Sequence, residues 1–474
     1  MCPPPALYAG QDGFDPETWV TQAAGPLTTE IIGLHDASPM TETKSQSRTR
    51  PGLRSRLHGA PLLGKLGPGL ITGAADDDPS GIATYSQGGA QFGYGLLWTL
   101  VLTFPLMAAI QMVSALVGRV TGRGLAHNMA QVMPRPLVMG LLALLFVANT
   151  INVGADLAAM GAAAKLVLGF NQHAFTLGFA FLSLGLQLFI PYRRYARFLT
   201  VLTFSLFAYV ALMFLLPLDW AAIGGGLIGL QPMPSEQAAT TIVAIFGTTI
   251  SPYLFFWQSS QEVEEVDQKP DEKPLLEAPR QAPQAIERIR IDTIAGMALS
   301  NLIGLAIMIA TAATLHAHGV TNINSAADAA SALKPIAGRF AFSLFALGII
   351  GTGLLAVPVL AGSAGYAVAD AAGWKTGLDN MPWQARGFYS VIGAAVLLGL
   401  GIDWSPLDPI KALYWSAVLN GVVAVPMMAA LMVVACSRRK MGDFRARWVL
   451  GGLGWLSTAV MAAATVTMLY VNLK

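Results

Sequence analysis

Three consecutive carboxylates interrupt an apolar segment, and this interruption constrains the fold more than any other feature of the sequence. The segment runs from Leu66 to Trp98 and reads LGPGLITGAADDDPSGIATYSQGGAQFGYGLLW. A helix needs about 20 residues to cross a bilayer, so neither apolar half spans alone, whereas the two halves together suffice. We therefore predict a transmembrane helix over 66–90 that is broken at 76–81.

The broken helix predicts an oxygen-lined site for a cation. A carboxylate at the bilayer centre costs about 2.5–3.5 kcal/mol, so Asp76, Asp77 and Asp78 need a polar cavity or a cation to face. Pro79 removes a backbone donor and Gly81 permits an unwound backbone, which frees nearby carbonyls to point at a ligand. Carboxylates and free carbonyls together suit a cation. The alternative is an Asp-Pro turn between two short helices near the membrane surface.

The composition is that of a polytopic membrane protein. Of the 474 residues, 54% are hydrophobic and 12% are charged, whereas about 25% of a soluble protein is charged. The basic residues lie between apolar runs, so the net charge of +2 does not indicate nucleic-acid binding. Cys2 and Cys436 alone predict neither a disulfide framework nor a thiolate metal site. We expect a lipid bilayer around the protein, no cofactor and no obligate protein partner.

Hydropathy divides the chain into a tail and a membrane domain. Residues 1–60 are rich in Pro, Ser, Thr and Gly and predict a disordered cytoplasmic tail, and residues 61–474 predict the transmembrane domain. About eleven spans are expected, near 66–90, 95–118, 136–163, 173–191, 197–216, 239–260, 288–315, 340–369, 387–403, 410–436 and 447–470. Basic residues gather in alternate connections, so we expect a plasma-membrane protein with its amino terminus in the cytoplasm and its carboxyl terminus outside.

The sixth predicted span is interrupted as well, at 247–252. It contains Pro252, and the small polar residues before this proline can satisfy freed backbone groups or contribute oxygens to a ligand. These residues are Gly247, Thr248, Thr249 and Ser251. A Pro-kinked helix without a ligand is the alternative. Breaks in the first and the sixth span are typical of two five-helix inverted repeats whose unwound segments meet at the midplane.

The third predicted span carries a polar stripe. Asn149, Asn152 and Asp156 are three and four residues apart, so they share one face of the helix. These side chains either hydrogen-bond to a neighbouring helix or line a water-filled path from the site, with Asp156 as the charge on that path.

An acidic segment follows the sixth span. It contains Glu262, Glu264, Glu265 and Asp267 and leads into a stretch punctuated by prolines. We interpret this segment as a solvated cytoplasmic linker, whose acidic start would also raise the cation concentration at the inner mouth.

Short motifs along the chain resemble, in order and spacing, those of the NRAMP divalent-metal transporters. They are Asp78-Pro79-Ser80-Gly81, TGRGLA at Thr121–Ala126, GADLAAMG at Gly154–Gly161, GTTISP at Gly247–Pro252, and Met441-Gly442. The similarity covers roughly Gly67 to Tyr470. It implies an all-α, leucine-transporter-type fold, with inverted repeats of spans 1–5 and 6–10 plus an eleventh helix. It also implies a secondary transporter rather than an enzyme.

The chain departs from the family pattern at positions that the resemblance assigns to the metal. The asparagine of the family's DPGN motif falls on Gly81, and a metal-contacting methionine of its sixth span falls on Ser251. A family alanine and a family histidine fall on Thr248 and Tyr253. Additional acids stand at Asp76 and Asp77, and two acidic positions implicated in proton transfer fall on Asn149 and Ala159.

With these departures, the chain resembles the NRAMP-related magnesium transporters. Oxygen ligands suit Mg²⁺ and Mn²⁺, and small residues at Gly81 and Ser251 leave room for an ion that keeps its waters. We expect uptake of Mg²⁺, or of Mn²⁺, by alternating access and without proton coupling. The expected metal site is Asp76, Asp77, Asp78, Gly81, Thr248 and Ser251, and the expected pathway residues are Asn149, Asn152, Asp156 and Tyr253.

Other functions stay open at this point. One is a proton-coupled Mn²⁺ or Fe²⁺ transporter of the ordinary NRAMP type. Another is an amino-acid or organic-solute transporter of the same fold, which is disfavoured because three aspartates would repel a substrate carboxylate. A third is an intramembrane aspartyl protease built on Asp78 and Asp156, whose chemistry needs two carboxylates sharing a proton.

Overall fold

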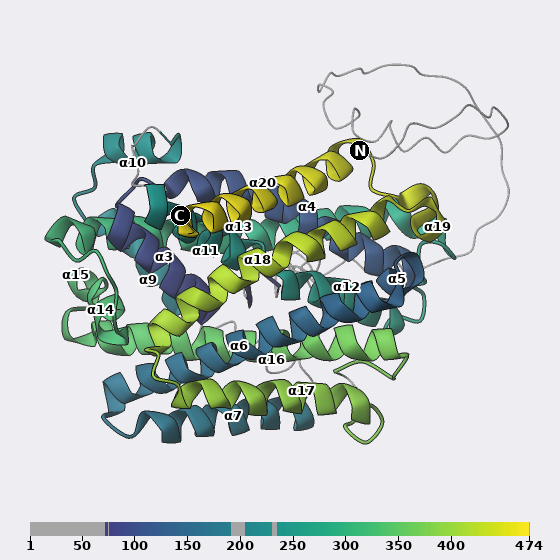
Figure 1. Cartoon of the computed structure of the whole chain (residues 1–474), viewed down its shortest axis with the longest axis horizontal. Helices are drawn as coiled ribbons and strands as arrows, with labels where there is room; N and C mark the ends of the chain where they lie inside the picture. The colour runs from purple at the N-terminus through teal and green to yellow at the C-terminus, as the bar shows by residue number, and fades with distance from the viewer. Residues whose placement is uncertain (1–71, 74, 191–203, 230–234, 379, 474) are drawn as a thin grey trace, which may run out of the picture. The chain divides into compact units, whose positions relative to one another are not determined.

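The computed structural model describes residues 72–73, 75–190, 204–229, 235–378 and 380–473, and the regular elements of this part are all helices (Figure 1). The predicted tail over 1–60 lies outside the described residues. The α-helices are α3 (Pro79–Phe92), α4 (Leu97–Thr121), α5 (Leu125–Val132), α6 (Arg135–Leu168), α7 (Gln172–Phe189), α9 (Phe207–Leu215), α10 (Trp220–Leu227), α11 (Ser235–Thr249), α12 (Pro252–Asp267), α13 (Ala282–Thr314), α14 (Ala326–Ser331), α15 (Lys334–Ala337), α16 (Ala341–Ala372), α17 (Arg386–Gly399), α18 (Pro409–Cys436), α19 (Arg438–Met441) and α20 (Trp448–Asn472). Short 3₁₀ helices lie at Phe204–Leu206, Pro279–Gln281, His316–His318, Gly338–Phe340, Leu400–Trp404 and Gly442–Phe444.

Within the described residues, 8 helical segments are long and apolar enough to cross a membrane. They overlap the spans predicted near 95–118, 136–163, 239–260, 288–315, 340–369, 387–403, 410–436 and 447–470. The predicted first span is represented by α3 and a short helical stretch before it, and the predicted fourth span by α7. The predicted fifth span, 197–216, lies partly outside the described residues and ends in the nine-residue α9.

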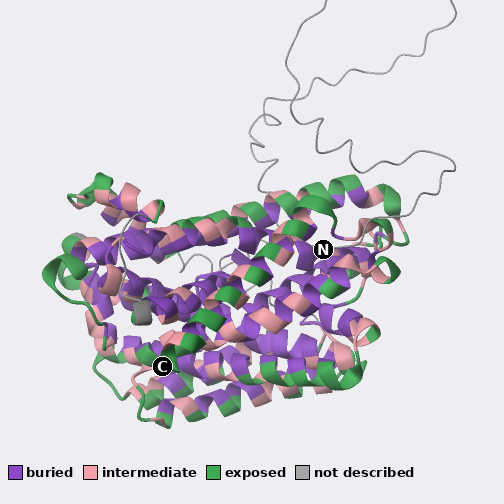
Figure 2. Ribbon diagram, turned by 45° about the horizontal axis from the view of Figure 1, so that its top comes forward, coloured by how far each residue is buried: buried purple, intermediate pink, exposed green. Residues whose placement is uncertain are grey.

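The two broken helices lie in the interior of the bundle. α3 packs against α13 and α18, α11 packs against α18, and α12 packs against α4 and α16. Figure 1 shows α6, α16, α17 and α7 side by side next to this group. Buried residues concentrate where these helices meet, and exposed residues lie on the outward helix faces (Figure 2). Large apolar side chains on those faces, such as Leu137 and Phe181, suit contact with lipid.

Both interruptions are short and begin a new helix with a proline. The helical stretch before the first break ends at Asp76, and α3 begins at Pro79 with Asp78 as its N-cap. The second break lies between α11, which ends at Thr249, and α12, which begins at Pro252. A proline at the first helical position is favourable, because its missing N–H would lack a partner there in any case. The interruptions therefore lie within the predicted ranges 76–81 and 247–252 but are narrower.

A pair of glycines lets α11 approach α18 closely, just before the second break. A Cβ atom at Gly247 would lie 2.1 Å from the carbonyl oxygen of Ala417 and 2.4 Å from the amide nitrogen of Gly421. Backbone atoms cannot move aside as a side chain can, so a larger residue would push the two helices apart. Gly247 therefore serves packing, which leaves its neighbour Thr248 to present a side chain to the site.

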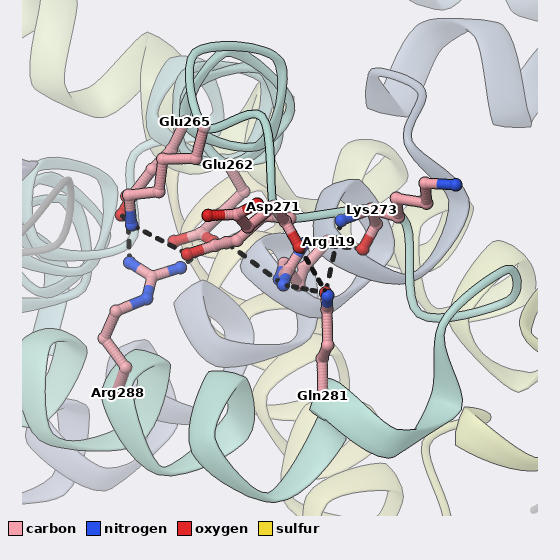
Figure 3. A network of polar contacts seen from close by, with 9 residues as sticks. Arg119, Glu262, Glu265, Asp271, Lys273, Gln281 and Arg288 are labelled. Atoms are coloured by element: carbon pink, nitrogen blue, oxygen red, sulfur yellow. Dashed lines mark hydrogen bonds and ion pairs between the residues drawn. The ribbon is translucent and has the colours of Figure 1, made fainter.

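The acidic segment after the second break forms ion pairs, so its interpretation as a solvated linker is wrong. α12 continues through this segment, and Glu262 is 0% exposed. Figure 3 shows Arg288 of α13 reaching Glu262 and Glu265 of α12. The ion pairs join Arg288 Nη2 to Glu262 Oε2 at 2.5 Å and Arg288 Nη1 to Glu265 Oε2 at 2.9 Å. Arg119 at the end of α4 pairs with Glu272 at 3.1 Å. A buried carboxylate requires such a partner, and the network ties α4, α12 and α13 together.

Candidate metal centre

Asp78 caps the N-terminus of α3, and this role fixes one of its two carboxylate oxygens. Oδ1 accepts hydrogen bonds from the Ser80 hydroxyl at 2.6 Å and from the Gly81 amide at 2.8 Å. Oδ2 lies 3.4 Å from Asn152 Nδ2 and 3.4 Å from the Tyr253 hydroxyl, which are long and weak contacts. The side chain is 1% exposed. Asp78 is thus oriented by the backbone and retains one carboxylate oxygen that can bind a cation.

The residues of the second break play two different roles. The Ser251 hydroxyl lies 2.9 Å from the Gly247 carbonyl oxygen and 2.8 Å from the Thr248 carbonyl oxygen, so it serves the backbone groups freed by the break. The Thr248 hydroxyl is buried and has no hydrogen-bond partner among the described residues. A Cβ atom at Gly81 would lie 3.1 Å from this hydroxyl oxygen, so Thr248 contacts the first turn of α3. Thr248 is therefore the better placed of the two to bind an ion near Asp78.

Tyr253 bridges the two breaks. Its hydroxyl belongs to α12 and lies 3.2 Å from the Ala75 carbonyl oxygen and 3.4 Å from Asp78 Oδ2. A phenol has one proton to donate, so it can serve only one of these acceptors at a time. While the hydroxyl donates its proton to one acceptor, the lone pairs of its oxygen remain able to bind a cation near Asp78.

The three residues of the polar stripe on α6 have different roles: one packs against a neighbouring helix, and the others lie at or near Asp78. Asn149 donates from Nδ2 to the Leu360 carbonyl at 3.0 Å and to the Ser363 hydroxyl at 2.8 Å, so it connects α6 to α16. Asn152 contacts Asp78 instead. Asp156 is 0% exposed, and neither of its carboxylate oxygens has a hydrogen-bond partner among the described residues. Asp156 lies one helical turn from Asn152 on the same face of α6, and Asn152 contacts Asp78, so Asp156 belongs to the same polar interior.

Asp76 and Asp77 face a different helix from Asp78. The Ser300 hydroxyl of α13 lies 2.6 Å from Asp76 Oδ2 and 3.0 Å from Asp77 Oδ1. Asp76 is 0% exposed and Asp77 3% exposed. Ser300 was not among the predicted site residues, because a single serine in an apolar span gives no periodic signal.

The predicted metal ligands therefore do not all converge on one point. Gly81 lies in the first turn of α3 and donates its N–H to Asp78, so it positions the carboxylate rather than offering an oxygen. No group of three or more His, Cys, Asp and Glu side chains around a common point is found in the described part of the chain. The candidate ligands near Asp78 are instead neutral oxygens, from Thr248, Tyr253 and Asn152.

No basic side chain balances these acids within the part of the chain that the structure describes. The ion pairs found among those residues do not include Asp76, Asp77, Asp78 or Asp156. Burying an ionised carboxylate without a partner is strongly unfavourable. The acids at the first break are therefore suited to bind cations that come from solution.

A cavity of about 430 Å³ lies beside α3, which follows the first break, and α11, which precedes the second. Its lining includes Gln87 and Gln91 of α3, Gln237 and Thr240 of α11, and Tyr414 of α18. Gln91 donates to Gln237 across the two helices at 2.7 Å. Side-chain amides and hydroxyls of this kind hydrogen-bond to the water around a hydrated ion, so the cavity suits the passage of one.

A helical membrane bundle with two broken helices, and with buried carboxylates at one break that lack basic partners, defines a membrane transport protein. The chain belongs to the Natural resistance-associated macrophage protein-like (Nramp) family, whose model matches residues 69–471. Proteins of this family are transporters, so the chain is not an enzyme.

Relatives and solved structures agree with this assignment. The chain is 29% identical over 415 residues to the divalent metal cation transporter MntH of Klebsiella pneumoniae, a match that covers 85% of this chain and 92% of that protein. The structure resembles a manganese transporter of Eremococcus coleocola, with a TM-score of 0.68 and 19% identity over 86% of this chain and 87% of the other. It also resembles Mhp1, a nucleobase-cation-symport-1 family transporter, with a TM-score of 0.55 and 12% identity over 86% and 92% of the two chains.

These findings confirm the predicted all-helical, leucine-transporter-type fold and the resemblance to NRAMP proteins. They do not support the narrower resemblance to NRAMP-related magnesium transporters, because the named relatives are a divalent metal cation transporter and a manganese transporter. They favour the alternative, a member of the ordinary NRAMP type.

Proposed function

We propose that the protein is a secondary transporter that carries Mn²⁺ across the membrane by alternating access, with Asp78 as the principal ligand. The observation that carries this proposal is the geometry of Asp78. One oxygen is held by the first turn of α3, and the other lies in a buried polar interior without a basic partner among the described residues. The family of the chain, and its similarity to a divalent metal cation transporter and to a manganese transporter, support a divalent metal as the substrate.

The arrangement supplies the ligands that a hard divalent ion prefers. Asp78 offers a carboxylate oxygen, Thr248 a hydroxyl without a described partner, and Tyr253 a phenol oxygen. Oxygen ligands of this kind suit Mn²⁺, and retained water molecules can complete its coordination. Asn152 is held near Asp78 by a long contact and can turn its amide oxygen toward the ion. The proposed site thus lies between the two breaks and uses residues from α3, α6, α11 and α12.

Mg²⁺ is a second candidate substrate, favoured by the same all-oxygen neighbourhood of Asp78. The side chains that contact its carboxylate are a hydroxyl, an amide and a phenol, and none of them is a thioether. The expected spare volume for a hydrated ion does not lie at Gly81, because a Cβ atom there would already lie 3.1 Å from Thr248 Oγ1 and 3.5 Å from Tyr85 Cε2. The comparisons favour Mn²⁺ over Mg²⁺, so we place Mg²⁺ second.

Uptake by the purified full-length protein in liposomes tests this proposal. Mn²⁺ entry is followed with an enclosed dye that Mn²⁺ quenches, and Mg²⁺, Ca²⁺ and Cd²⁺ are added outside as competitors. We expect saturable Mn²⁺ entry that excess Mg²⁺ inhibits only weakly. Inhibition by Mg²⁺ at concentrations equal to Mn²⁺ would favour the second candidate, and entry of neither ion would contradict both.

Transport without proton coupling stays a prediction, and Asp156 is the residue on which it depends. Tyr253 and Asn149 lack a titratable group in the working pH range, whereas Asp156 is a buried acid one helical turn from Asn152, which contacts Asp78. Liposomes that enclose a pH dye should show no stoichiometric acidification during Mn²⁺ uptake. A proton flux that accompanies uptake and disappears in Asp156→Asn would instead support the ordinary, proton-coupled NRAMP mechanism.

We further propose a plasma-membrane location with the amino terminus in the cytoplasm, supported by the basic residues in alternate connections. Protease or cysteine-labelling access to tags at each terminus in intact cells tests this orientation.

A further inference from the structure

The three aspartates of the first break divide between two sides of α3. Asp78 lies with Asn152 of α6 and Tyr253 of α12, whereas Asp76 and Asp77 share the Ser300 hydroxyl of α13. A hydroxyl has one proton, so Ser300 can donate to only one of its two carboxylates at a time. The other carboxylate oxygen near Ser300, and Asp76 Oδ1, are then left without a donor among the described residues.

A second polar group lies on the same side of α3 and also lacks a partner. The Tyr85 hydroxyl is buried at 1% exposure and has no hydrogen-bond partner among the described residues. A Cβ atom at Gly304 would lie 3.0 Å from Tyr85 Cζ, the atom that carries this hydroxyl. Gly304 and Ser300 are four residues apart and share one face of α13. The phenol end of Tyr85 therefore lies against the face of α13 that carries Ser300.

The position of Tyr85 relative to the carboxylates points in the same direction. A Cβ atom at Gly81 would lie 3.5 Å from Tyr85 Cε2 and 3.6 Å from the Asp76 carbonyl oxygen, so the ring and the Asp76 backbone flank the same point. Two carboxylates, a shared hydroxyl and an unpartnered phenol thus gather between α3 and α13.

The balance of charge at the break leads to the same conclusion. Asp76, Asp77 and Asp78 carry three negative charges when ionised, and Asp156 adds a fourth. One divalent ion at Asp78 neutralises two of them, and the described residues supply no ion-pair partner for the rest. Uncompensated charge at this depth is strongly unfavourable.

We propose that Asp76, Asp77 and Ser300 form a second cation site on the α13 side of α3, with Tyr85 as a neutral oxygen ligand. The site binds a hard cation, either a second divalent ion or Na⁺, since its ligands are all oxygens. It is occupied together with the ion at Asp78. The proposal rests on the proposed function, in that Asp78 binds the transported ion.

Metal stoichiometry of the purified full-length protein tests this proposal without a transport assay. The protein is dialysed to equilibrium against Mn²⁺, and in parallel against radioactive Na⁺, and the bound ion per chain is measured. We expect two bound cations per wild-type chain. Asp78→Ala should keep the cation at Asp76 and Asp77, and the double variant Asp76→Asn, Asp77→Asn should keep only the Mn²⁺ at Asp78.

Ser300→Ala gives a milder test that leaves both carboxylates in place. It should weaken the second cation by about tenfold, which corresponds to about 1.4 kcal/mol, and leave the Mn²⁺ at Asp78 unchanged. Ser457→Ala on α20 is the matched control, because Ser457 is also 0% exposed and its hydroxyl contacts Met428 Sδ rather than a carboxylate. Unchanged affinity for both cations in Ser300→Ala would overturn the assignment of this serine.

The outcomes separate the second site from the proposed function. A second Mn²⁺ that the double variant loses and Asp78→Ala retains supports a divalent occupant, and a Na⁺ with the same behaviour supports a monovalent one. A single bound Mn²⁺ that Asp78→Ala abolishes, with no bound Na⁺, overturns the second site and leaves the proposed function standing. A wild-type chain that binds no Mn²⁺ overturns the proposed function, and one that binds neither Mn²⁺ nor Na⁺ overturns both.

Discussion

The protein buries acidic side chains in two regions, and the two regions balance their charges differently. Along the last turns of α12, Glu262 and Glu265 both contact Arg288, which belongs to the neighbouring α13 (Figure 3). At the first helix break, Asp76 and Asp78 are equally buried, yet their contacts are hydroxyls, a side-chain amide and one backbone N–H. Burial is the same in both regions, and the presence of a basic partner differs.

This difference separates a structural role from a binding role. A buried carboxylate that is paired within the chain holds two helices in register, and removing its partner leaves an uncompensated charge. A buried carboxylate without a described partner destabilises the empty protein and gains free energy when a cation binds. The same substitution, loss of one charge, should therefore lower stability at α12 and α13 but lower cation binding at the first break.

The largest expected effect is the loss of transport in Asp78→Ala. Removing the charged ligand should weaken ion binding by about 3 kcal/mol or more, and uptake should fall by at least about 100-fold. The melting temperature of the metal-free protein should fall little, because an unpaired buried charge is removed along with the cap. Uptake into liposomes and thermal unfolding without metal measure the two effects.

Asp219→Ala is the matched control for this substitution. Asp219 is also an N-cap, of α10, and accepts hydrogen bonds from the amides of Ala221 and Ala222, but it is exposed. Loss of this cap should cost about 1 kcal/mol of helix stability and leave uptake unchanged. Uptake near wild-type rates in Asp78→Ala would show that the transported ion binds elsewhere.

The largest effect on stability, rather than on transport, is expected from Arg288→Met, which acts on the paired acids of α12. The substitution leaves Glu262, which is 0% exposed, without the guanidinium that lies 2.5 Å away. Breaking a buried pair on one side costs about 3–5 kcal/mol, so the melting temperature should fall clearly. The double variant Glu262→Met, Arg288→Met should recover most of this loss, because it removes both charges. Thermal unfolding of the three proteins in detergent measures the effect.

Arg290→Met serves as the control on the same helix. Arg290 is exposed and takes part in none of the ion pairs found among the described residues. Its loss should shift stability by no more than about 0.5 kcal/mol. If the double variant were as unstable as Arg288→Met alone, the network would contribute through packing rather than through charge.

The contrast between the two acidic regions also shows which parts of the fold and of the site can be predicted from the sequence. The run of aspartates, Pro79 and Pro252 indicated both interruptions, because charge and proline are incompatible with an unbroken apolar helix. The pairing of broken first and sixth spans then indicated the inverted-repeat fold, which the comparisons confirm. These inferences depend on local chemistry and on the order of the spans, both of which are visible in one chain.

The spacing of residues along the sequence does not predict which distant residues contact one another. Glu262 and Arg288 are 26 residues apart and belong to different helices, so the acidic segment looked solvated. The spacing of Asn149 gave the helix face but not the partner, which is a carbonyl and a hydroxyl of α16. The division of the aspartates depends on Ser300, and no periodicity in span seven singles out that residue.

A moderate effect on the selectivity between divalent ions is expected from changing the type of side chain near Asp78. Ser251→Met together with Gly81→Asn places a thioether and an amide near Asp78, and soft ligands favour Cd²⁺ over Mg²⁺ and Mn²⁺. The asparagine must displace the Thr248 hydroxyl, which lies 3.1 Å from the position of its Cβ atom. We expect Cd²⁺ to compete with Mn²⁺ uptake about tenfold more strongly than in the wild type, a change of about 1.4 kcal/mol.

Two single variants separate the causes of this shift. Ser251→Met alone should shift competition less, since it adds the thioether without the amide and the effects of neighbouring substitutions need not add. Gly81→Ala adds volume without a ligand and should reduce uptake of every ion without favouring Cd²⁺. A wild type that already binds Cd²⁺ more tightly than Mn²⁺ and Mg²⁺ would show that ligand softness does not govern this site.

The smallest expected effect tests whether burial, rather than charge itself, sets the importance of a pair. Lys269 contacts Glu265 at 2.7 Å and Glu272 at 2.9 Å, but its side chain is 44% exposed. After Lys269→Met, Glu265 still contacts Arg288 and Glu272 still contacts Arg119, so neither acid becomes unpaired. Exposed pairs contribute about 0.2–1 kcal/mol and are screened by salt, so the loss should be under about 1 kcal/mol and should shrink at high ionic strength. Thermal unfolding at low and high salt measures both features. A loss as large as that of Arg288→Met, and insensitive to salt, would mean that total charge rather than burial decides stability here, and the contrast between the two acidic regions would fail.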